Sequence, residues 1–219
     1  MDVHASEKEQ VEALKQWWKD NGSSVVTGVL LGLSVLLGFK AWQSWQERQS
    51  MGASNLYAQM MIYAGNDSAA DGPNEQVQAL ANQLISDHSG SVYATLAALQ
   101  LAREAVRQGE LSAAEAQLRW ALEHAGSEEV RHTARLRLIR VLIGLKQFDD
   151  AEKQLAGVQD AGAYASRYSE LKGDLAVARG QNAAAADAYR QALDQLPENA
   201  SNQALLTAKY ESVSGGDTP

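Results

Sequence analysis

The sequence contains no cysteine, only three prolines and only two phenylalanines among its 219 residues. Without cysteine there is no disulfide framework, no thiolate zinc site and no thiol nucleophile, but the compartment stays undetermined, because an oxidising space permits disulfides without requiring them. Proline is scarce and alanine and leucine are abundant, which favours helix over sheet. We therefore expect an all-α protein.

Basic residues are also fewer than acidic ones, with 19 Lys and Arg against 27 Asp and Glu. An acidic chain lacks the broad basic footprint of a nucleic-acid-binding protein, so we expect no nucleic-acid partner. The histidines have no ligand-like spacing, and we expect surface positions for them; they are His4, His88, His124 and His132. No nucleophile elbow or dinucleotide motif is present. We expect no enzyme activity, no catalytic residue, no cofactor and no metal.

One long apolar run stands out: residues 22–39 carry no charge between Asp20 and Lys40. As a helix these residues rise about 27 Å, and continuation through Trp42 reaches the roughly 30 Å hydrocarbon core of a bilayer. The long, net acidic lead argues against a cleaved signal peptide. A buried core helix is the alternative, but it would need a larger core than this chain offers. We predict a retained membrane anchor.

The residues that flank the run support a span. Amphipathic aromatic rings favour the headgroup level, and the membrane-interface anchors that we expect are Trp17, Trp18, Trp42 and Trp45. Three lysines precede the run, at positions 8, 15 and 19, whereas Lys40 and Arg48 follow it closely. The positive-inside rule then places the N-terminus in the cytoplasm.

Small residues recur every four positions inside the run, at Ser24, Gly28 and Gly32. Such a ridge, which includes a GxxxG pattern, allows a second membrane helix to approach closely. Glycine is common in membrane helices in any case, so simple lipid exposure is the alternative. We expect this face to pack against a partner helix.

A repeat begins near Ser91 and determines the expected fold. Ala114, Ala151 and Ala185 occupy equivalent positions, separated by 37 and 34 residues, close to the 34-residue period of tetratricopeptide repeats. A small residue at this position lets two antiparallel helices touch, and larger residues one and two turns later fill the groove against the next repeat. An irregular helical bundle with coincidental spacing is the alternative. We predict an α-solenoid.

The first helices of such repeats build a concave face that binds peptides in many solenoids. The repeat phase directs one set of residues towards this face: Leu96, Leu99, Arg103, Arg107, Thr133, Leu136, Arg137, Arg140, Arg167, Glu170 and Asp174. Arginine interleaved with leucine suits an amphipathic chain segment. A merely solvated charged face is the alternative.

The expected organisation has five parts. They are an N-terminal cytoplasmic segment 1–21, a transmembrane helix 22–42, connecting helices with an atypical first repeat 43–90, tetratricopeptide-like repeats 91–212 and a flexible tail 213–219.

The block "EQVEALKQWWKDNG", the run "GVLLGLSVLLGFKAW" and the alanine-rich repeats that follow resemble the YfgM family, the ancillary subunit of the SecYEG translocon in Gram-negative bacteria. The similarity extends over nearly the whole chain. The resemblance implies a single-span inner-membrane protein with a periplasmic repeat domain, associated with SecYEG and with the membrane-anchored chaperone PpiD, near emerging unfolded secreted chains. It supplies no catalytic residues. A repeat scaffold for another envelope assembly, such as outer-membrane or cell-wall biogenesis, is the alternative function.

Overall fold

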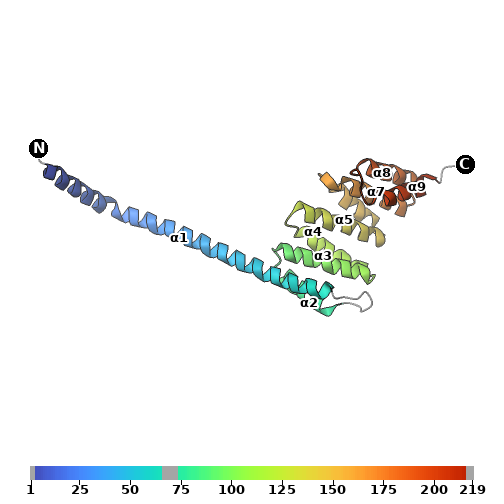
Figure 1. Cartoon of the computed structure of the whole chain (residues 1–219), viewed down its shortest axis with the longest axis horizontal. Coiled ribbons are helices and arrows are strands. Elements are labelled where there is room, and N and C mark those ends of the chain that lie inside the picture. Colours follow the sequence, from blue (N-terminus) through green and yellow to red (C-terminus); the bar gives the residue numbers. More distant parts are fainter. Residues whose placement is uncertain (1–2, 66–73, 216–219) are drawn as a thin grey trace. The chain divides into compact units, whose positions relative to one another are not determined.

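The computed structural model describes residues 3–65 and 74–215, with every side chain in these ranges except those of residues 3–8 and 44–49. Within these ranges every regular element is a helix, and no strand is present (Figure 1). The expected all-α fold is therefore confirmed. The chain divides into two compact units, Met1–Met51 and Gly52–Pro219.

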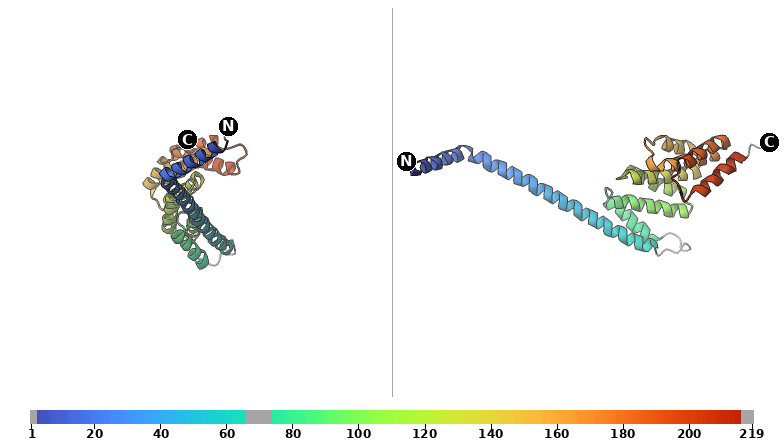
Figure 2. Two further views of the ribbon diagram at one scale, coloured as in Figure 1. Left: turned by 90° about the vertical axis from the view of Figure 1, so that its left-hand side faces the viewer. Right: turned by 45° about the horizontal axis from the view of Figure 1, so that its top comes forward.

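Helix α1 is Val3–Gly65 and passes from the first unit into the second. The segment 66–73, where the sequence predicts a break, lies outside the described residues. The remaining helices belong to the second unit and follow one another closely (Figures 1 and 2). They are α2 Glu75–Asp87, α3 Val92–Arg107, α4 Leu111–Glu123, α5 Glu128–Gly144, α6 Phe148–Ala156, the 3-10 turn η1 Gly162–Tyr164, α7 Ala165–Ala178, α8 Asn182–Asp194 and α9 Gln203–Ser214.

Three helices begin at side-chain caps that satisfy otherwise unpaired backbone N–H groups. Asn74 accepts from the Val77 N–H at 3.1 Å at the start of α2. The hydroxyl groups of Ser91 and Ser127 do the same for α3 and α5. These polar residues fix where each helix starts after its loop.

The same turn joins the two helices of three successive pairs, α3–α4, α5–α6 and α7–α8. A residue with positive φ occupies its centre, and these residues are Gly109 at 79°, Lys146 at 60° and Gly180 at 74°. One backbone hydrogen bond spans each turn: Glu110 N to Ala105 O, Gln147 N to Leu142 O, and Gln181 N to Ala176 O. The turn recurs after 37 and then 34 residues. This regular recurrence confirms the predicted tetratricopeptide-like repeat and excludes an irregular bundle.

The three small residues that define the repeat, Ala114, Ala151 and Ala185, are fully buried. Around them lies a continuous apolar core from α3 to α7, which includes Leu118, Leu138, Ile139, Leu142 and Leu171. A second cluster joins the end of α1 to α2 and α3 through Ala53, Met60, Val77, Ala81, Leu84 and Ala97. The end of α1 is thus part of the stack of helices, as the contact of Tyr57 with Tyr93 also shows, at 5.5 Å between ring centroids.

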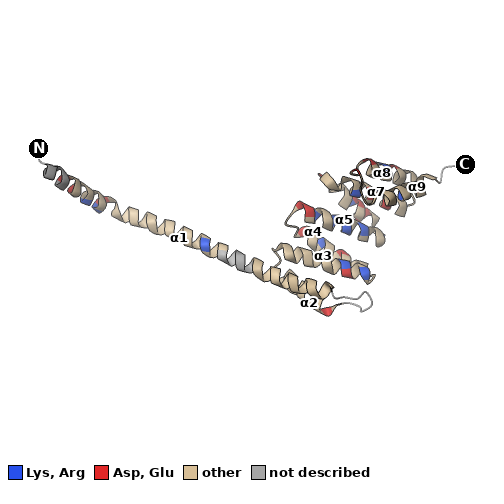
Figure 3. Ribbon diagram, viewed as in Figure 1, with Lys and Arg blue, Asp and Glu red and all other residues tan. Residues whose placement is uncertain are grey.

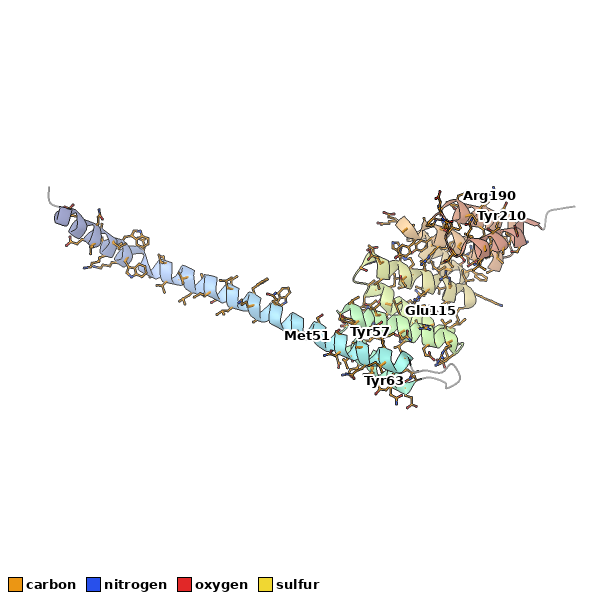
Figure 4. The ribbon with its side chains drawn as sticks, in the orientation of Figure 1. Met51, Tyr57, Tyr63, Glu115, Arg190 and Tyr210 are labelled. Atoms are coloured by element: carbon orange, nitrogen blue, oxygen red, sulfur yellow. The ribbon has the colours of Figure 1, made fainter. Side chains whose placement is uncertain are left out.

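Helix α9 closes the array by packing on α7 and α8. Leu206 is buried beside Tyr189 and Ala192, and Val213 packs against the same cluster. Arg190 of α8 lies over the ring of Tyr210 of α9, with 5.8 Å between the guanidinium carbon and the ring centroid (Figure 4). Residues 213 and 214, expected at the start of a flexible tail, are therefore helical, and 216–219 lie outside the described residues.

Candidate partner-binding surfaces

The apolar run of α1 is exposed along its length. The helix is long and apolar enough to cross a membrane between Glu9 and Gln43, and only 6% of its most apolar stretch is buried by protein. Charged side chains are absent from residues 22–39 (Figure 3). In a soluble core helix most of these side chains would be covered, so this exposure favours the predicted membrane anchor over a buried core helix.

Two of the four hydroxyl groups inside this run are satisfied by the helix itself. The Thr27 hydroxyl donates to the Ser23 carbonyl at 2.7 Å, and the Ser34 hydroxyl donates to the Leu30 carbonyl at 2.8 Å. A polar group that enters hydrocarbon without a partner costs several kcal/mol, so this internal pairing suits a lipid environment.

The small-residue ridge of α1 leaves the backbone open to close approach. A Cβ added at Gly28 or Gly32 would meet no atom within 4 Å, and Ser24 is exposed on the same ridge. Trp17, Trp18 and Trp42 are all about half exposed, as interface residues would be. The side chain of Trp45 lies outside the described residues.

A pocket of about 370 Å³ opens between α3, α4 and α5, and we call it the arginine pocket. Three of the predicted face residues, Arg103, Arg137 and Arg140, lie around it. The rest of the lining is apolar and consists of Ala102, Val106, Leu111, Leu118 and Val141. The repeat stack therefore brings arginines of α3 and α5 together, although they are more than thirty residues apart in the sequence.

The positive charge of this pocket is uncompensated. Among the residues that the structure describes, no carboxylate lies within ion-pair distance of Arg103, Arg137 or Arg140. Partial burial lowers the pKa of the Arg137 guanidinium, and the neighbouring charges of Arg103 and Arg140 lower it further. The three groups repel one another, so an anion placed between them would be attracted to all three.

Other predicted face residues do not line the pocket. Leu99 and Leu136 are only 6% and 3% exposed and belong to the core, which corrects their assignment to a partner-binding face. Leu96 is partly buried against the same core.

Two predicted arginines have surroundings of their own. Arg107 forms an ion pair with Glu104 at 2.8 Å, one turn earlier on α3. Arg167 is exposed on α7 and lies over the ring of Tyr164 at 6.0 Å. Neither side chain lines the arginine pocket.

A second charged group links α7 to α9 and includes two predicted face residues, Glu170 and Asp174, but their partner Lys209 was not predicted from the sequence. Lys209 donates to Glu170 at 2.7 Å and to Asp174 at 2.8 Å, and the Tyr189 hydroxyl also donates to Asp174 at 2.8 Å. The repeat interval could have predicted Lys209 at this position. Charged residues recur there at intervals of 37, 34 and 35 residues, and they are Arg103, Arg140, Asp174 and Lys209.

One of the four histidines departs from its expected surface position. His132 is 9% exposed and lies within 2.8 Å of the Tyr168 hydroxyl, with its ring stacked on Tyr164 at 4.7 Å. Two tyrosines from the α7 region cover it, which local sequence could not predict. His4 lies outside the residues with described side chains. Across the described part of the chain, no group of three His, Cys, Asp or Glu residues could hold a metal ion.

Helix pairs joined by one recurring turn, together with an apolar helix long enough to cross a membrane, define a tetratricopeptide-like repeat protein with a candidate membrane span. In agreement, a family described as a tetratricopeptide repeat-like domain matches residues 15–215.

Curated relatives identify the family. A Haemophilus influenzae protein is 32% identical over 88% of this chain and 91% of its own length, and an Escherichia coli protein is 31% identical over 86% and 88%. A Neisseria gonorrhoeae protein is 26% identical over 97% and 100%. Each is named an ancillary SecYEG translocon subunit. The chain belongs to this family. No solved structure matches it.

Proposed function

We propose that this protein is a single-span inner-membrane subunit of the SecYEG translocon, with a cytoplasmic N-terminus and a periplasmic repeat domain. Residues 22–42 form the span, and the ridge of Ser24, Gly28 and Gly32 packs against a membrane helix of the channel. The repeat domain is a non-enzymatic docking platform that links emerging secreted chains to a membrane-anchored chaperone of the PpiD type.

One observation carries the proposal: an exposed apolar helix and a tetratricopeptide-like domain occur together in a chain whose relatives are ancillary SecYEG translocon subunits. The relatives align with 86–88% of the chain, and the family match over residues 15–215 includes the apolar helix as well as the repeats. The exposed face of α1 supports a membrane location, and the uncompensated arginines support a binding role for the repeats.

Site-specific crosslinking in living cells tests the proposal. A photo-crosslinking residue at Gly28 is expected to capture a translocon subunit, and one at Arg137 a chaperone or secreted chain. Lys153, which is exposed on α6, is the matched control position. Recovery of cell-wall or outer-membrane assembly proteins in place of translocon subunits, after purification of the full-length protein in mild detergent, would overturn the proposal.

The proposed orientation has its own test, because the chain has no cysteine and each introduced thiol is unique. A thiol from Ser201→Cys is expected to react with a membrane-impermeant maleimide in intact spheroplasts, whereas a thiol from Glu9→Cys reacts only after lysis. The opposite pattern would contradict a periplasmic repeat domain.

A further inference from the structure

The arginine pocket combines two properties that are seldom found together on a simply solvated surface. Its lining is largely apolar and includes the buried Leu118 and Val141, and three arginines complete it. Its volume of about 370 Å³ lies within the roughly 300–1,000 Å³ range of ligand pockets. The site therefore suits a ligand that has an apolar group and anionic groups close to one another.

Most other arginines of the repeat domain pair with a carboxylate, whereas Arg135 donates to the Gly157 carbonyl and Arg167 lies over Tyr164. Arg119 pairs with Glu115 at 2.8 Å, Arg179 with Glu152 at 2.8 Å, and Arg131 with Glu128 at 3.1 Å. The domain is acidic overall, so carboxylates were available to pair with the pocket arginines as well. Instead the pocket holds three guanidinium groups without such partners within its described surroundings.

In the third repeat the same position forms an ion pair with the next helix of the array, α9. Asp174 occupies the repeat position of Arg103 and Arg140, and there Lys209 of α9 reaches both Asp174 and Glu170. On the same helix, Leu206 is 1% exposed. Helix α9 thus combines an apolar side chain in the core with a charge opposite to that of the repeat position. In the first two repeats the next first helices of the array are α5 and α7, and among the described residues neither forms an ion pair with Arg103 or Arg140.

We propose that the arginine pocket binds an acidic amphipathic segment of a partner polypeptide, with an apolar side chain against its apolar lining and side-chain carboxylates on Arg103, Arg137 and Arg140. This inference rests on the proposed function, since it gives the chemistry of the segment that the docking platform receives. Charge-assisted hydrogen bonds from guanidinium to carboxylate supply specificity, and relief of the mutual repulsion of the arginines adds to affinity.

Fluorescence anisotropy with the full-length protein in nanodiscs of zwitterionic lipid tests this directly. The probe is a labelled helical peptide with leucine at i, i+3, i+4 and i+7 and glutamate beside each leucine. Saturable, salt-sensitive binding is expected, and the peptide with every glutamate replaced by glutamine should bind at least about tenfold more weakly.

Variants of the protein locate the binding. Arg137→Gln and Arg140→Gln should each weaken binding of the acidic peptide about tenfold, whereas Arg190→Gln, exposed on α8 outside the pocket, should leave its affinity unchanged. Because Arg137 and Arg140 have no internal ion pair, these variants should retain the helical circular dichroism of the parent. Arg140→Glu should restore binding to a peptide that carries lysine in place of glutamate.

Several outcomes would overturn the inference: equal affinity for the acidic and glutamine peptides, an equal effect of Arg190→Gln, or pocket-dependent binding of anionic phospholipid vesicles but not of the peptide. Failure here is distinguishable from failure of the proposed function. Crosslinking from Gly28 to the translocon with no peptide binding defeats only this inference, whereas peptide binding without any translocon contact defeats only the proposed function.

Discussion

Equivalent positions of successive repeats carry side chains of different size, and the residue that faces each one compensates for the difference. Leu118, Leu155 and Tyr189 stand at equivalent positions, and so do Ala102 and Gly173 on the facing helices. The large ring of Tyr189 is accommodated because Gly173 has no side chain: a Cβ at Gly173 would overlap the ring atoms Cδ1 and Cε1. Both residues are buried, so neither can move without disturbing its neighbours.

Gly173→Ala is expected to lower the free energy of unfolding by about 1–3 kcal/mol, because the added methyl group overpacks the contact with Tyr189. Urea titration followed by circular dichroism measures the change. Adding Tyr189→Leu, the residue of the first two repeats, should recover part of the loss, and Gly126→Ala, with open space around its Cβ, is the control. A Gly173→Ala variant as stable as the parent would contradict this packing.

At the scale of the element, α9 is held to the preceding repeat by a buried leucine and an ionic group. Burial alone would lower the pKa of the Lys209 ammonium, but its hydrogen bonds to Asp174 and Glu170 raise it overall. Burial and the hydrogen bond to Asp174 also raise the pKa of the Tyr189 hydroxyl. The folded state therefore holds both protons more tightly than the unfolded chain does.

This linkage predicts a loss of stability at alkaline pH. A group whose pKa is higher in the folded than in the unfolded state stabilises the fold fully at any pH below its unfolded pKa. That unfolded pKa is near 10.0 for Tyr189 and 10.5 for Lys209. The stabilisation is lost as pH rises through the pKa of the folded state. The urea midpoint should be constant from neutral pH to about 9 and fall above about 10.5.

Lys209→Met should lower the midpoint at neutral pH already, since it leaves two carboxylates facing each other, and should flatten its decline at alkaline pH. Lys153→Met breaks only an exposed pair with Asp150 and serves as the control, with a change of less than about 0.5 kcal/mol. Identical alkaline curves for Lys209→Met and the parent would refute the role of this ammonium group.

The whole chain consists of an exposed apolar helix region and a repeat unit with its own core. The clusters that stabilise the second unit draw only on residues from Ala53 onward. Such a unit has what independent folding requires, whereas the first unit has no packed core among its described side chains.

Removal of residues 1–51 is therefore expected to release a fragment that stays in aqueous buffer and melts cooperatively at the midpoint of the full chain in detergent. Detergent phase partition and thermal circular dichroism measure the two properties. A fragment that remains with the membrane, or that loses its cooperative transition, would show that the second unit depends on the first.

The sequence by itself determined the helices, the repeat and the apolar run. Composition predicts the helices, and the interval between Ala114, Ala151 and Ala185 predicts the repeat. Both depend on local geometry, because a helix presents the same face every few residues and a small residue marks a close contact between helices. The apolar length of residues 22–39 likewise predicted a candidate span without knowledge of any contact.

Only the tertiary structure decided which side chains remain accessible. Leu99 and Leu136 share a predicted face with Arg103 and Arg140, yet the leucines pack into the core and the arginines surround a pocket. Likewise, Lys209 meets Asp174 only because α9 packs against the third repeat. Helical periodicity gives a residue's direction on its own helix, but burial and charge pairing depend on what the neighbouring helices, distant in sequence, place opposite it.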